Sequence, residues 1–324
     1  MNVDANEAVT TTIAGFETIA AGHAARVGAA DPLLPTPPDL RSEAGVELLT
    51  SSSGDSAGVG LTSVAEVADT GRAAWQARVE HRLDVRLAGP DPDSALGELL
   101  IHWDDYLANI TEPGDADVAA VIRRPSRDSA GSAELLRHGF APVVGVAVRP
   151  AERMAAAGPA MTPGVCIRAA EDSDLATAVR LQLELQAFDA QFGLANLQEN
   201  AEELLTHELH ELLAASEPSV WIAELYGRPL GMVRVQLPPQ ADWVRPFVRA
   251  ERVGYLTSLA VAGEARSSGV GTALAGHAHQ VFDEAGADVV LLHHALANPL
   301  STPFWYAQGY RPLWTYWQRR PAVR

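Results

Sequence analysis

The loop Arg266-Ser267-Ser268-Gly269-Val270-Gly271 has the composition and position to bind an anion. An apolar strand-like segment ends just before it, and an amphipathic helix begins within it. The first backbone N–H groups of a helix lack partners inside the helix, and the helix dipole adds partial positive charge at the same end. Because glycine has no Cβ, a phosphate can approach this main chain closely. The sequence therefore predicts a phosphate-binding helix entrance.

Other classes of phosphate-binding site do not fit the sequence. The loop lacks the Gly-Lys-Ser/Thr of a P-loop and the full glycine fingerprint of a dinucleotide-binding fold. The chain has no lysine at all, which also excludes a Schiff-base lysine. Its formal net charge of −17 argues against a nucleic acid partner, because binding a phosphate backbone needs concentrated positive charge. This acidity suits an amine substrate, although solubility explains it more simply.

A second pattern lies downstream of the loop. Asn298 opens a helix, Phe304-Trp305 lies within it, and Gly309-Tyr310 closes it before a final strand. Together the two patterns resemble the Arg/Gln-x-x-Gly-x-Gly/Ala loop and the Asn and Gly-aromatic signature of the Gcn5-related N-acetyltransferases (GNAT). The loop alone is a weak signal, and its combination with the second pattern and the strand order is specific. The resemblance covers residues 165–320.

The resemblance implies an enzyme that transfers an acyl group, expected to be acetyl, from coenzyme A directly to an amine. Backbone amides from Ser267 to Thr272 would hold the coenzyme A pyrophosphate. The end of the strand 253–261 would separate from the next strand and pair with the pantetheine arm, and the amide of Leu259 or Val261 would polarise the thioester carbonyl. The predicted coenzyme-binding residues are Leu259, Ala260, Val261, Arg266, Ser267, Ser268, Gly269, Val270, Gly271, Thr272, Asn298 and Trp305.

The predicted general acid departs from the family pattern. In the family, a tyrosine seven residues after the asparagine protonates the departing thiolate, and this chain has Trp305 at that position. Indole is a hydrogen-bond donor without a usable pKa, so Trp305 cannot be the acid. Tyr306 is about 100° further round the helix, and it is the candidate acid. Protonation by water and impaired catalysis are the alternatives.

The sequence locates the general base less well. Glu251 is the candidate catalytic base, and Glu224 and Asp189 are further acids that could lie on the acceptor side. Each is more simply a solvated surface acid, and a chain of water molecules could remove the proton instead. The sequence does not reveal the acceptor. The loops 186–196 and 238–250 are expected to shape its pocket, and their aromatic residues indicate an apolar component.

The elements that would position these residues follow from periodicity. The second half is predicted to contain a strand, two helices, three strands, a helix, a strand, a helix and a final strand. Strands are predicted at 220–225 and 253–261, and Gly286 is predicted to end the helix after the glycine loop. The predicted fold class is α/β, with a mixed central sheet flanked by helices.

The first half resembles a degenerate copy of the second. The strand 83–87 followed by Ala88-Gly89 matches 257–261 followed by Ala262-Gly263, and Gly139-Phe140 matches Gly309-Tyr310. Asp91 and Asp93 would repel phosphate in this copy. We therefore predict two tandem GNAT-like domains, 1–158 without coenzyme A binding and 159–324 as the acyltransferase. The Ser/Gly-rich segment 51–60 is interpreted as a linker, and no role is derived for a helix at about residues 8–27.

The remaining features set limits on location and partners. One cysteine, Cys166, cannot form an internal disulfide, and neither a signal peptide nor a membrane span is predicted, so we expect a cytoplasmic protein. The histidine pairs His207/His210 and His293/His294 do not have the spacing of a metal site, so no metal is predicted. The expected partners are acyl-CoA and an amine acceptor. Trp314 and Trp317 in the last strand are consistent with a homodimer or domain interface. The alternative function is a non-catalytic acyl-CoA-binding or sensor protein.

Overall fold

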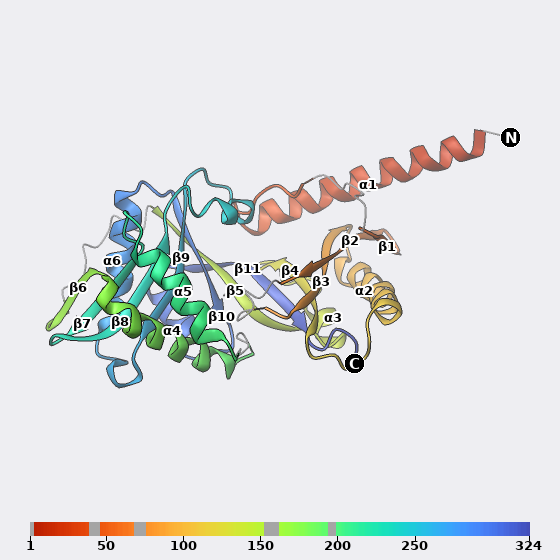
Figure 1. Ribbon diagram of the computed structural model, residues 1–324. Helices are drawn as coiled ribbons and strands as arrows, with labels where there is room; N and C mark the ends of the chain where they lie inside the picture. Colours follow the sequence, from red (N-terminus) through yellow and green to blue (C-terminus); the bar gives the residue numbers. More distant parts are fainter. Residues whose placement is uncertain (1–2, 39–45, 68–75, 152–161, 194–198) are drawn as a thin grey trace. The chain divides into compact units, whose positions relative to one another are not determined.

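The computed structural model describes residues 3–38, 46–67, 76–151, 162–193 and 199–324 (Figure 1). The chain forms two compact units. The first unit comprises residues 1–67, 77–143 and 313–324, and the second comprises residues 68–76 and 144–312. Each unit contains its own run of neighbouring strands and its own apolar core, so each is described separately below.

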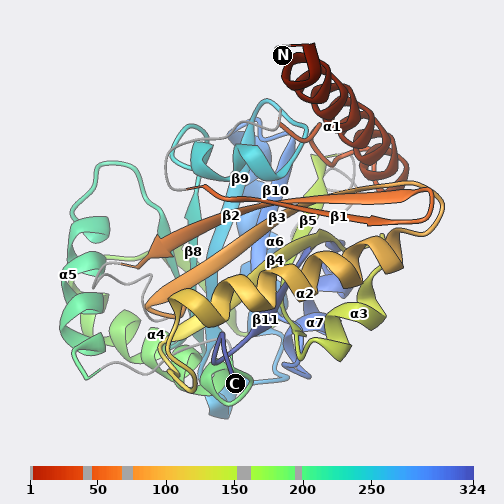
Figure 2. The same cartoon turned by 90° about the vertical axis from the view of Figure 1, so that its right-hand side faces the viewer.

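The sheet of the first unit has the strand order β1-β2-β3-β4-β11. Its helix α2 runs along one face of these strands (Figure 2) and contacts β1, β2 and β3. It packs an apolar side there, because leucines and Trp103 recur at helical spacing along it. The elements of this unit are α1 Val3–Ala30, β1 Leu48–Ser53, β2 Ser56–Glu66, β3 Val79–Ala88, α2 Pro92–Ile110, β4 Val118–Pro125, α3 Ser132–Arg137 and β11 Arg311–Arg319.

The sheet of the second unit has the strand order β5-β10-β9-β8-β7-β6. Helix α6 covers one face, and α4 and α5 cover the other (Figure 1). The elements of this unit are β5 Ala141–Pro150, β6 Val165–Ala169, α4 Leu175–Ala190, α5 Ala201–Leu213, β7 Val220–Leu225, β8 Arg228–Gln236, the 3-10 helix Asp242–Phe247, β9 Val253–Val261, α6 Val270–Glu284, β10 Val289–Ala295 and α7 Ser301–Ala307.

These elements confirm the predicted fold class and the predicted order of elements in the second half. β7 and β9 have the predicted bounds, and Gly286 ends α6 with a positive φ of 67°. Gly139 and Gly309, which the repeat aligns, also share a positive φ, of 80° and 88°. Only glycine adopts this conformation without strain, so the two Gly-aromatic pairs close their helices in the same way.

The interpretation of residues 51–60 as a linker is wrong. These residues form most of the hairpin of β1 and β2, in which Ser51 pairs with Gly58. A Cβ at Gly58 would lie 3.1 Å from a Leu87 methyl group, and one at Gly60 would lie 2.8 Å from a Leu83 methyl group. The small residues are therefore needed where leucines of β3 pack onto the hairpin, and they do not mark a flexible segment.

The last strand of each half pairs inside the other compact unit. β5 pairs antiparallel with β10, from Val289 opposite Pro150 to Ala295 opposite Val144. β11 pairs antiparallel with β4, from Trp314 opposite Pro125 to Arg319 opposite Ala120. The compact units are therefore discontinuous in sequence. The predicted domain boundary at 158/159 lies within residues 152–161, outside the described residues, and the two linear domains stay a prediction.

Two properties of the described residues bear on ligands and location. No helix among them is both long and apolar enough to cross a bilayer. In the same ranges, no group of three or more His, Cys, Asp and Glu side chains is arranged to hold a metal ion.

Candidate functional site

The central feature of the second unit is a fork between two parallel strands, β9 and β10. They pair at only three positions, and the last pair joins Tyr255 to Leu291. β9 then continues to Val261 and β10 to Ala295 without pairing to each other. The register between β8 and β9 shifts at Arg234/Val235, which leaves Thr257 as an extra residue in β9. Such a bulge bends a strand, and it lies just where the fork opens.

The far part of β9 turns main-chain amides toward the open side of this fork. Ala262 donates its N–H to the carbonyl of Leu230 on β8, and Ala260 lies opposite Met232 in the same register. Because the amides of an antiparallel strand alternate between its two sides, those of Leu259 and Val261 face away from β8. They therefore face the side from which β10 has separated. This is the geometry that the resemblance predicted for the pantetheine arm.

The loop before α6 has the backbone shape of an anion-binding helix entrance. Ser267 and Gly269 have positive φ angles of 63° and 88°, and Gly269 caps α6 without a side-chain hydrogen bond. The first bond of the helical pattern runs from the Ala273 amide to the Gly269 carbonyl, at 3.0 Å. The amides from Val270 to Thr272 precede that bond, so they lie in the first turn, where no intrahelical acceptor exists. No acidic residue lies in this first turn, so the dipole charge is not offset locally.

One predicted pyrophosphate donor is partly engaged within the loop. The Ser268 amide donates to the Ala265 carbonyl at 3.4 Å, and the Ser268 hydroxyl donates to the same oxygen at 2.6 Å. A hydrogen bond of 3.4 Å is long and weak. Ser268 therefore stabilises the turn, and the amides of the first helical turn are the better placed donors.

Arg266 holds the loop against α4. Its guanidinium lies 4.4 Å from the centre of the Phe188 ring and 3.7 Å from the Glu184 carboxylate. Glu184 also accepts a hydrogen bond from the Gly263 amide at 2.6 Å. The Arg266 side chain thus acts on the loop's position, and any contact that it makes with a phosphate remains a prediction.

Asn298 is buried, and both polar atoms of its side chain form hydrogen bonds within the protein. Its side-chain oxygen accepts hydrogen bonds from the amides of Leu300 at 2.9 Å and Ser301 at 3.2 Å, which caps the start of α7. Its side-chain nitrogen donates to Asp189 of α4 at 2.8 Å. Burial raises the pKa of Asp189, while the hydrogen bond from Asn298 and the charge of Arg266 oppose that shift. Asn298 therefore joins α7 to α4 beside the open end of β10.

Replacing Asn298 with alanine is expected to lower the free energy of unfolding by about 2–3 kcal/mol. The reason is that a helix cap is lost and the buried Asp189 carboxyl loses its donor. Urea unfolding measures the effect. Asn200→Ala is a matched control, because Asn200 precedes α5 without a capping hydrogen bond from its side chain. Equal stability of the two variants would show that Asn298 has no such structural role.

Trp305, which stands at the family's acid position, lies in the core, whereas Tyr306, the candidate acid, is exposed. Trp305 is 8% exposed and packs edge-on against Phe304 and Tyr310 in the core beneath α6. Tyr306, 38% exposed, lies edge-on to His294 of β10 with the ring centres 6.0 Å apart. Burial raises the pKa of Tyr306 and lowers the pKa of His294 to about 4. At neutral pH both are uncharged, and Tyr306 has a proton to donate.

The candidate bases lie apart from the fork. Glu251 is exposed in the loop before β9, and the strand from Val253 to Leu259, about 20 Å long, lies between that loop and the predicted donor amide. Glu224 on β7 accepts a hydrogen bond from Arg168 at 2.8 Å. Asp189 is the predicted acid that lies closest to the site, but it is bound to Asn298. This placement does not support Glu251 as the base, and its catalytic role has no support beyond the sequence prediction.

The profile of the Acetyltransferase (GNAT) family matches residues 184–310, which include α6, β10, α7 and the fork. This segment is a GNAT domain. A comparison with curated proteins finds no similar sequence.

Solved GNAT structures resemble the chain beyond this segment. A GCN5-related N-acetyltransferase from Sphaerobacter thermophilus is 15% identical, with a TM-score of 0.54, and the alignment covers 83% of this chain and 82% of that one. The GNAT fold therefore extends over most of the chain. A tandem GNAT protein from the clavulanic acid biosynthesis pathway is 15% identical, with a TM-score of 0.44, covering 94% of this chain and 95% of that one. An aminoglycoside N-acetyltransferase in complex with CoA is 17% identical, with a TM-score of 0.39, covering 46% and 89%.

The GNAT domain also contains an aromatic cluster that sequence reasoning did not assemble. The Tyr255 hydroxyl lies 3.0 Å from Nδ1 of His293, so β9 and β10 are linked across the mouth of the fork. The rings of Trp243 and Phe247 lie 6.3 Å and 6.0 Å from the His293 ring. Strand alternation places Tyr255 and His293 on the face opposite Leu256 and Leu292, which pack beneath α6. The sequence predicts that residues 238–250 help to shape the acceptor pocket, but it does not identify His293 as the partner of their aromatic side chains.

Proposed function

We propose that this chain is an acyl-CoA-dependent N-acyltransferase that transfers acetyl from acetyl-CoA to an amine. The proposal rests on two sets of backbone N–H donors that face the same opening. Amides of β9 face the gap left by β10, and the first turn of α6 begins just after β9 ends. An extended pantetheine arm needs the first set, and a pyrophosphate needs the second. The GNAT profile match over the same residues supports this assignment.

In the proposed reaction the amine nitrogen attacks the thioester carbonyl. The amide of Leu259 or Val261 donates to the oxygen as it becomes negative, which is the role of an oxyanion hole. The intermediate then collapses, the carbon–sulfur bond breaks, and the amide bond remains. The nitrogen loses a proton to water, and the departing thiolate takes one from Tyr306. No covalent enzyme intermediate is needed.

The acceptor is proposed to approach at the cluster of Trp243, Phe247, Tyr255 and His293. This cluster lies at the mouth of the fork, on the face opposite α6. Its aromatic surface suits an amine that has an apolar part, and aromatic faces also attract a cationic ammonium group. The formal net charge of −17 favours the approach of such a cation.

A non-catalytic acyl-CoA-binding protein is the second candidate function. The observation that favours it is Trp305, which fills a core position where the family places its acid. Calorimetry with acetyl-CoA tests the coenzyme site, and thiol release with a panel of primary amines tests transfer. Binding with amine-dependent thiol release supports the enzyme. Binding without release from any amine supports the second candidate, and no binding contradicts both.

A further inference from the structure

The first unit contains a second fork, built like the one in the GNAT domain. β3 and β4 pair in parallel from Val79 opposite Val118 to Leu83 opposite Ile122, and pairing then stops while both strands continue. The Val79 amide donates to the Asp117 carbonyl at the β4 side. Amides at every second position of a strand point the same way, so those of Val85 and Leu87 face the open part of this fork.

Leu87 is the counterpart of Val261. The repeat aligns Ala88-Gly89 with Ala262-Gly263, so the residue before each pair ends a strand at the tip of its fork. In the GNAT domain, the amide of Val261 is assigned to the coenzyme arm or the thioester oxygen. The question in the first unit is therefore which group the Leu87 amide binds.

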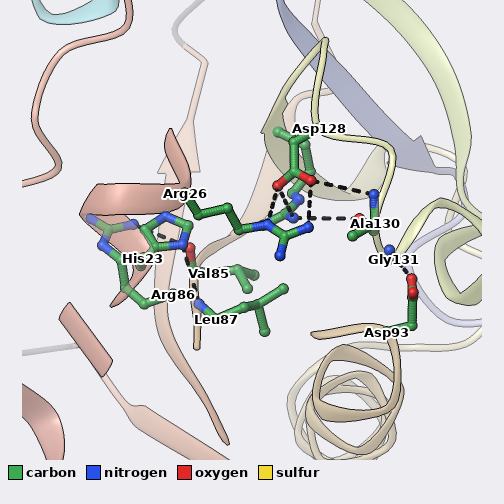
Figure 3. Close-up of polar contacts among 10 residues, drawn as sticks. His23, Arg26, Val85, Arg86, Leu87, Asp93, Asp128, Ala130 and Gly131 are labelled. Carbon is green, nitrogen blue, oxygen red and sulfur yellow. Dashed lines mark hydrogen bonds and ion pairs between the residues drawn. The ribbon is translucent and has the colours of Figure 1, made fainter. Parts of the chain in front are cut away.

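That group belongs to the chain's own first helix. The Leu87 amide donates to Nδ1 of His23 on α1 at 3.2 Å, and His23 is only 3% exposed (Figure 3). The helix approaches closely because residue 22 is glycine: a Cβ there would lie 2.9 Å from the Cβ of Ala88. Neighbouring Val27 is also buried. In this contact a buried acceptor, Nδ1 of His23, receives a hydrogen bond from an amide at the tip of β3.

An ion pair between the half-buried Arg26 and the buried Asp128 joins the same helix to the other strand of the fork. Nε and Nη2 of Arg26 each donate to a carboxylate oxygen of Asp128 at 2.7 Å, just beyond the end of β4 (Figure 3). Arg124 of β4 donates to the same carboxylate at 3.1 Å. Bidentate arginine pairs of this kind fix orientation as well as distance. α1 therefore bridges the fork, with His23 on β3 and Arg26 at the end of β4.

The helix entrance beside this fork is also occupied by the chain's own groups. Asp91 caps α2, where its carboxylate accepts hydrogen bonds from the Ser94 amide at 3.1 Å and the Ser94 hydroxyl at 2.6 Å. The carboxylate of Asp93 in the first turn accepts a hydrogen bond from the Gly131 amide. By contrast, Gly269 caps α6 without a side-chain bond and with no acid in the first turn. A carboxylate thus stands where the GNAT domain would bind a phosphate.

We propose that α1 is the resident ligand of the first fork, bound across its two strands in the place of a coenzyme arm. Its partner is this chain itself, and the ligand groups are the His23 imidazole and the Arg26 guanidinium. The helix keeps the tips of β3 and β4 fixed and leaves the chain with one coenzyme site. Only the identity of the group that it replaces rests on the proposed function of the GNAT domain.

Hydrogen exchange at the Leu87 amide tests this proposal. In the full-length protein we expect His23→Ala and Gly22→Val each to speed that exchange about tenfold or more, because the amide loses its acceptor. Glu17→Ala and Gly28→Val are the matched controls on exposed positions of α1, and a Cβ at Gly28 meets no atom within 4 Å. The controls are expected to leave the exchange unchanged. Unchanged exchange in both His23→Ala and Gly22→Val would overturn the proposal.

Titration with acetyl-CoA separates this proposal from that of the coenzyme site. One equivalent per chain, with no added protection at Val85 and Leu87, is the expected result. Two equivalents, or new protection at Leu87, would show that the first fork takes the coenzyme and that α1 is not its ligand. If no acetyl-CoA binds, the proposed function of the GNAT domain fails, while the exchange results still decide the role of α1.

Docking of α1 is also expected to weaken in acid. Burial, with the charges of Arg86 and Arg124, lowers the pKa of His23 to about 3, while Asp84 and Asp128 oppose that shift. A histidine whose pKa is lower when docked stabilises the docked state above pH 6.5 and loses that effect as the pH falls. The docking equilibrium should then fall by up to about tenfold per pH unit below 6.5.

Exchange at Leu87 between pH 7.5 and 5.5, corrected for the intrinsic rate, measures this loss. His23→Gln is the control, because the glutamine carbonyl can accept the same hydrogen bond but does not titrate. Burial also lowers the pKa values of His279 and His294 in the second unit, but both histidines are kept in this control, so their contribution is the same in the two proteins. The same pH dependence in wild type and His23→Gln would exclude His23 as the titrating contact.

Discussion

Acetyl-CoA affinity is expected to fall about 100-fold or more when Gly271 is replaced by leucine, if two charge-assisted amide hydrogen bonds are lost. Gly271 lies in the first turn of α6, and a Cβ there would lie 3.4 Å from the Phe304 ring and 3.6 Å from a Val261 methyl group. A longer side chain must grow between the tip of β9 and α7. It would fill the space beside the Val261 amide and cover the helix entrance. Isothermal titration calorimetry with acetyl-CoA measures the loss.

Gln280→Leu is the control for this substitution. Gln280 is exposed on the same helix, more than two turns further along, so leucine there changes the helix without approaching its entrance. Circular dichroism and the midpoint of thermal unfolding establish whether both variants remain folded. A folded Gly271→Leu protein with wild-type affinity would show that the coenzyme does not bind at the α6 entrance. That result would also contradict the assignment of the fork as the coenzyme site.

The sequence predicts the elements of the GNAT domain well because its periodicity is regular. The strand 253–261 and the glycine that ends α6 follow from local patterns, and the structure has both. The fork itself was expected only from the family resemblance, because the end of strand pairing depends on the bulge at Thr257. Local pattern thus predicts the strand, and tertiary packing determines where its partner leaves it.

Side-chain roles were harder to predict, because they depend on residues far away in sequence. Asn298 is bound by Asp189, which lies 109 residues away, and Arg266 stacks on Phe188 of another helix. The helix α1 had no predicted role because the partner of His23 is 64 residues away. The sequence could not predict that β5 pairs with β10 and β11 with β4 either. The residue pattern of each strand is compatible with either partner.

Because Trp305 stands where the family pattern has a tyrosine, Tyr306 is the acid in the proposed reaction. Because its pKa is raised by burial, its hydroxyl stays protonated at neutral pH and can donate to a thiolate. Tyr306→Phe keeps the ring that packs against His294 and removes only the hydroxyl. We expect kcat to fall about 100-fold, the lower end of what a positioned acid contributes. The KM for acetyl-CoA should change little, because the ring and the α6 entrance are kept.

Leaving-group chemistry separates an acid from a structural residue in the Tyr306→Phe variant. When the acyl donor is a thioester of a more acidic thiol, the thiolate departs without being protonated. The difference in kcat between the variant and wild type should therefore be smaller with such a donor. Tyr226→Phe is the matched control, since Tyr226 is 80% exposed in the turn between β7 and β8. If Tyr306→Phe retains the full rate with acetyl-CoA, water protonates the thiolate. In that case the loss of the family tyrosine at Trp305 has been accommodated without a replacement acid.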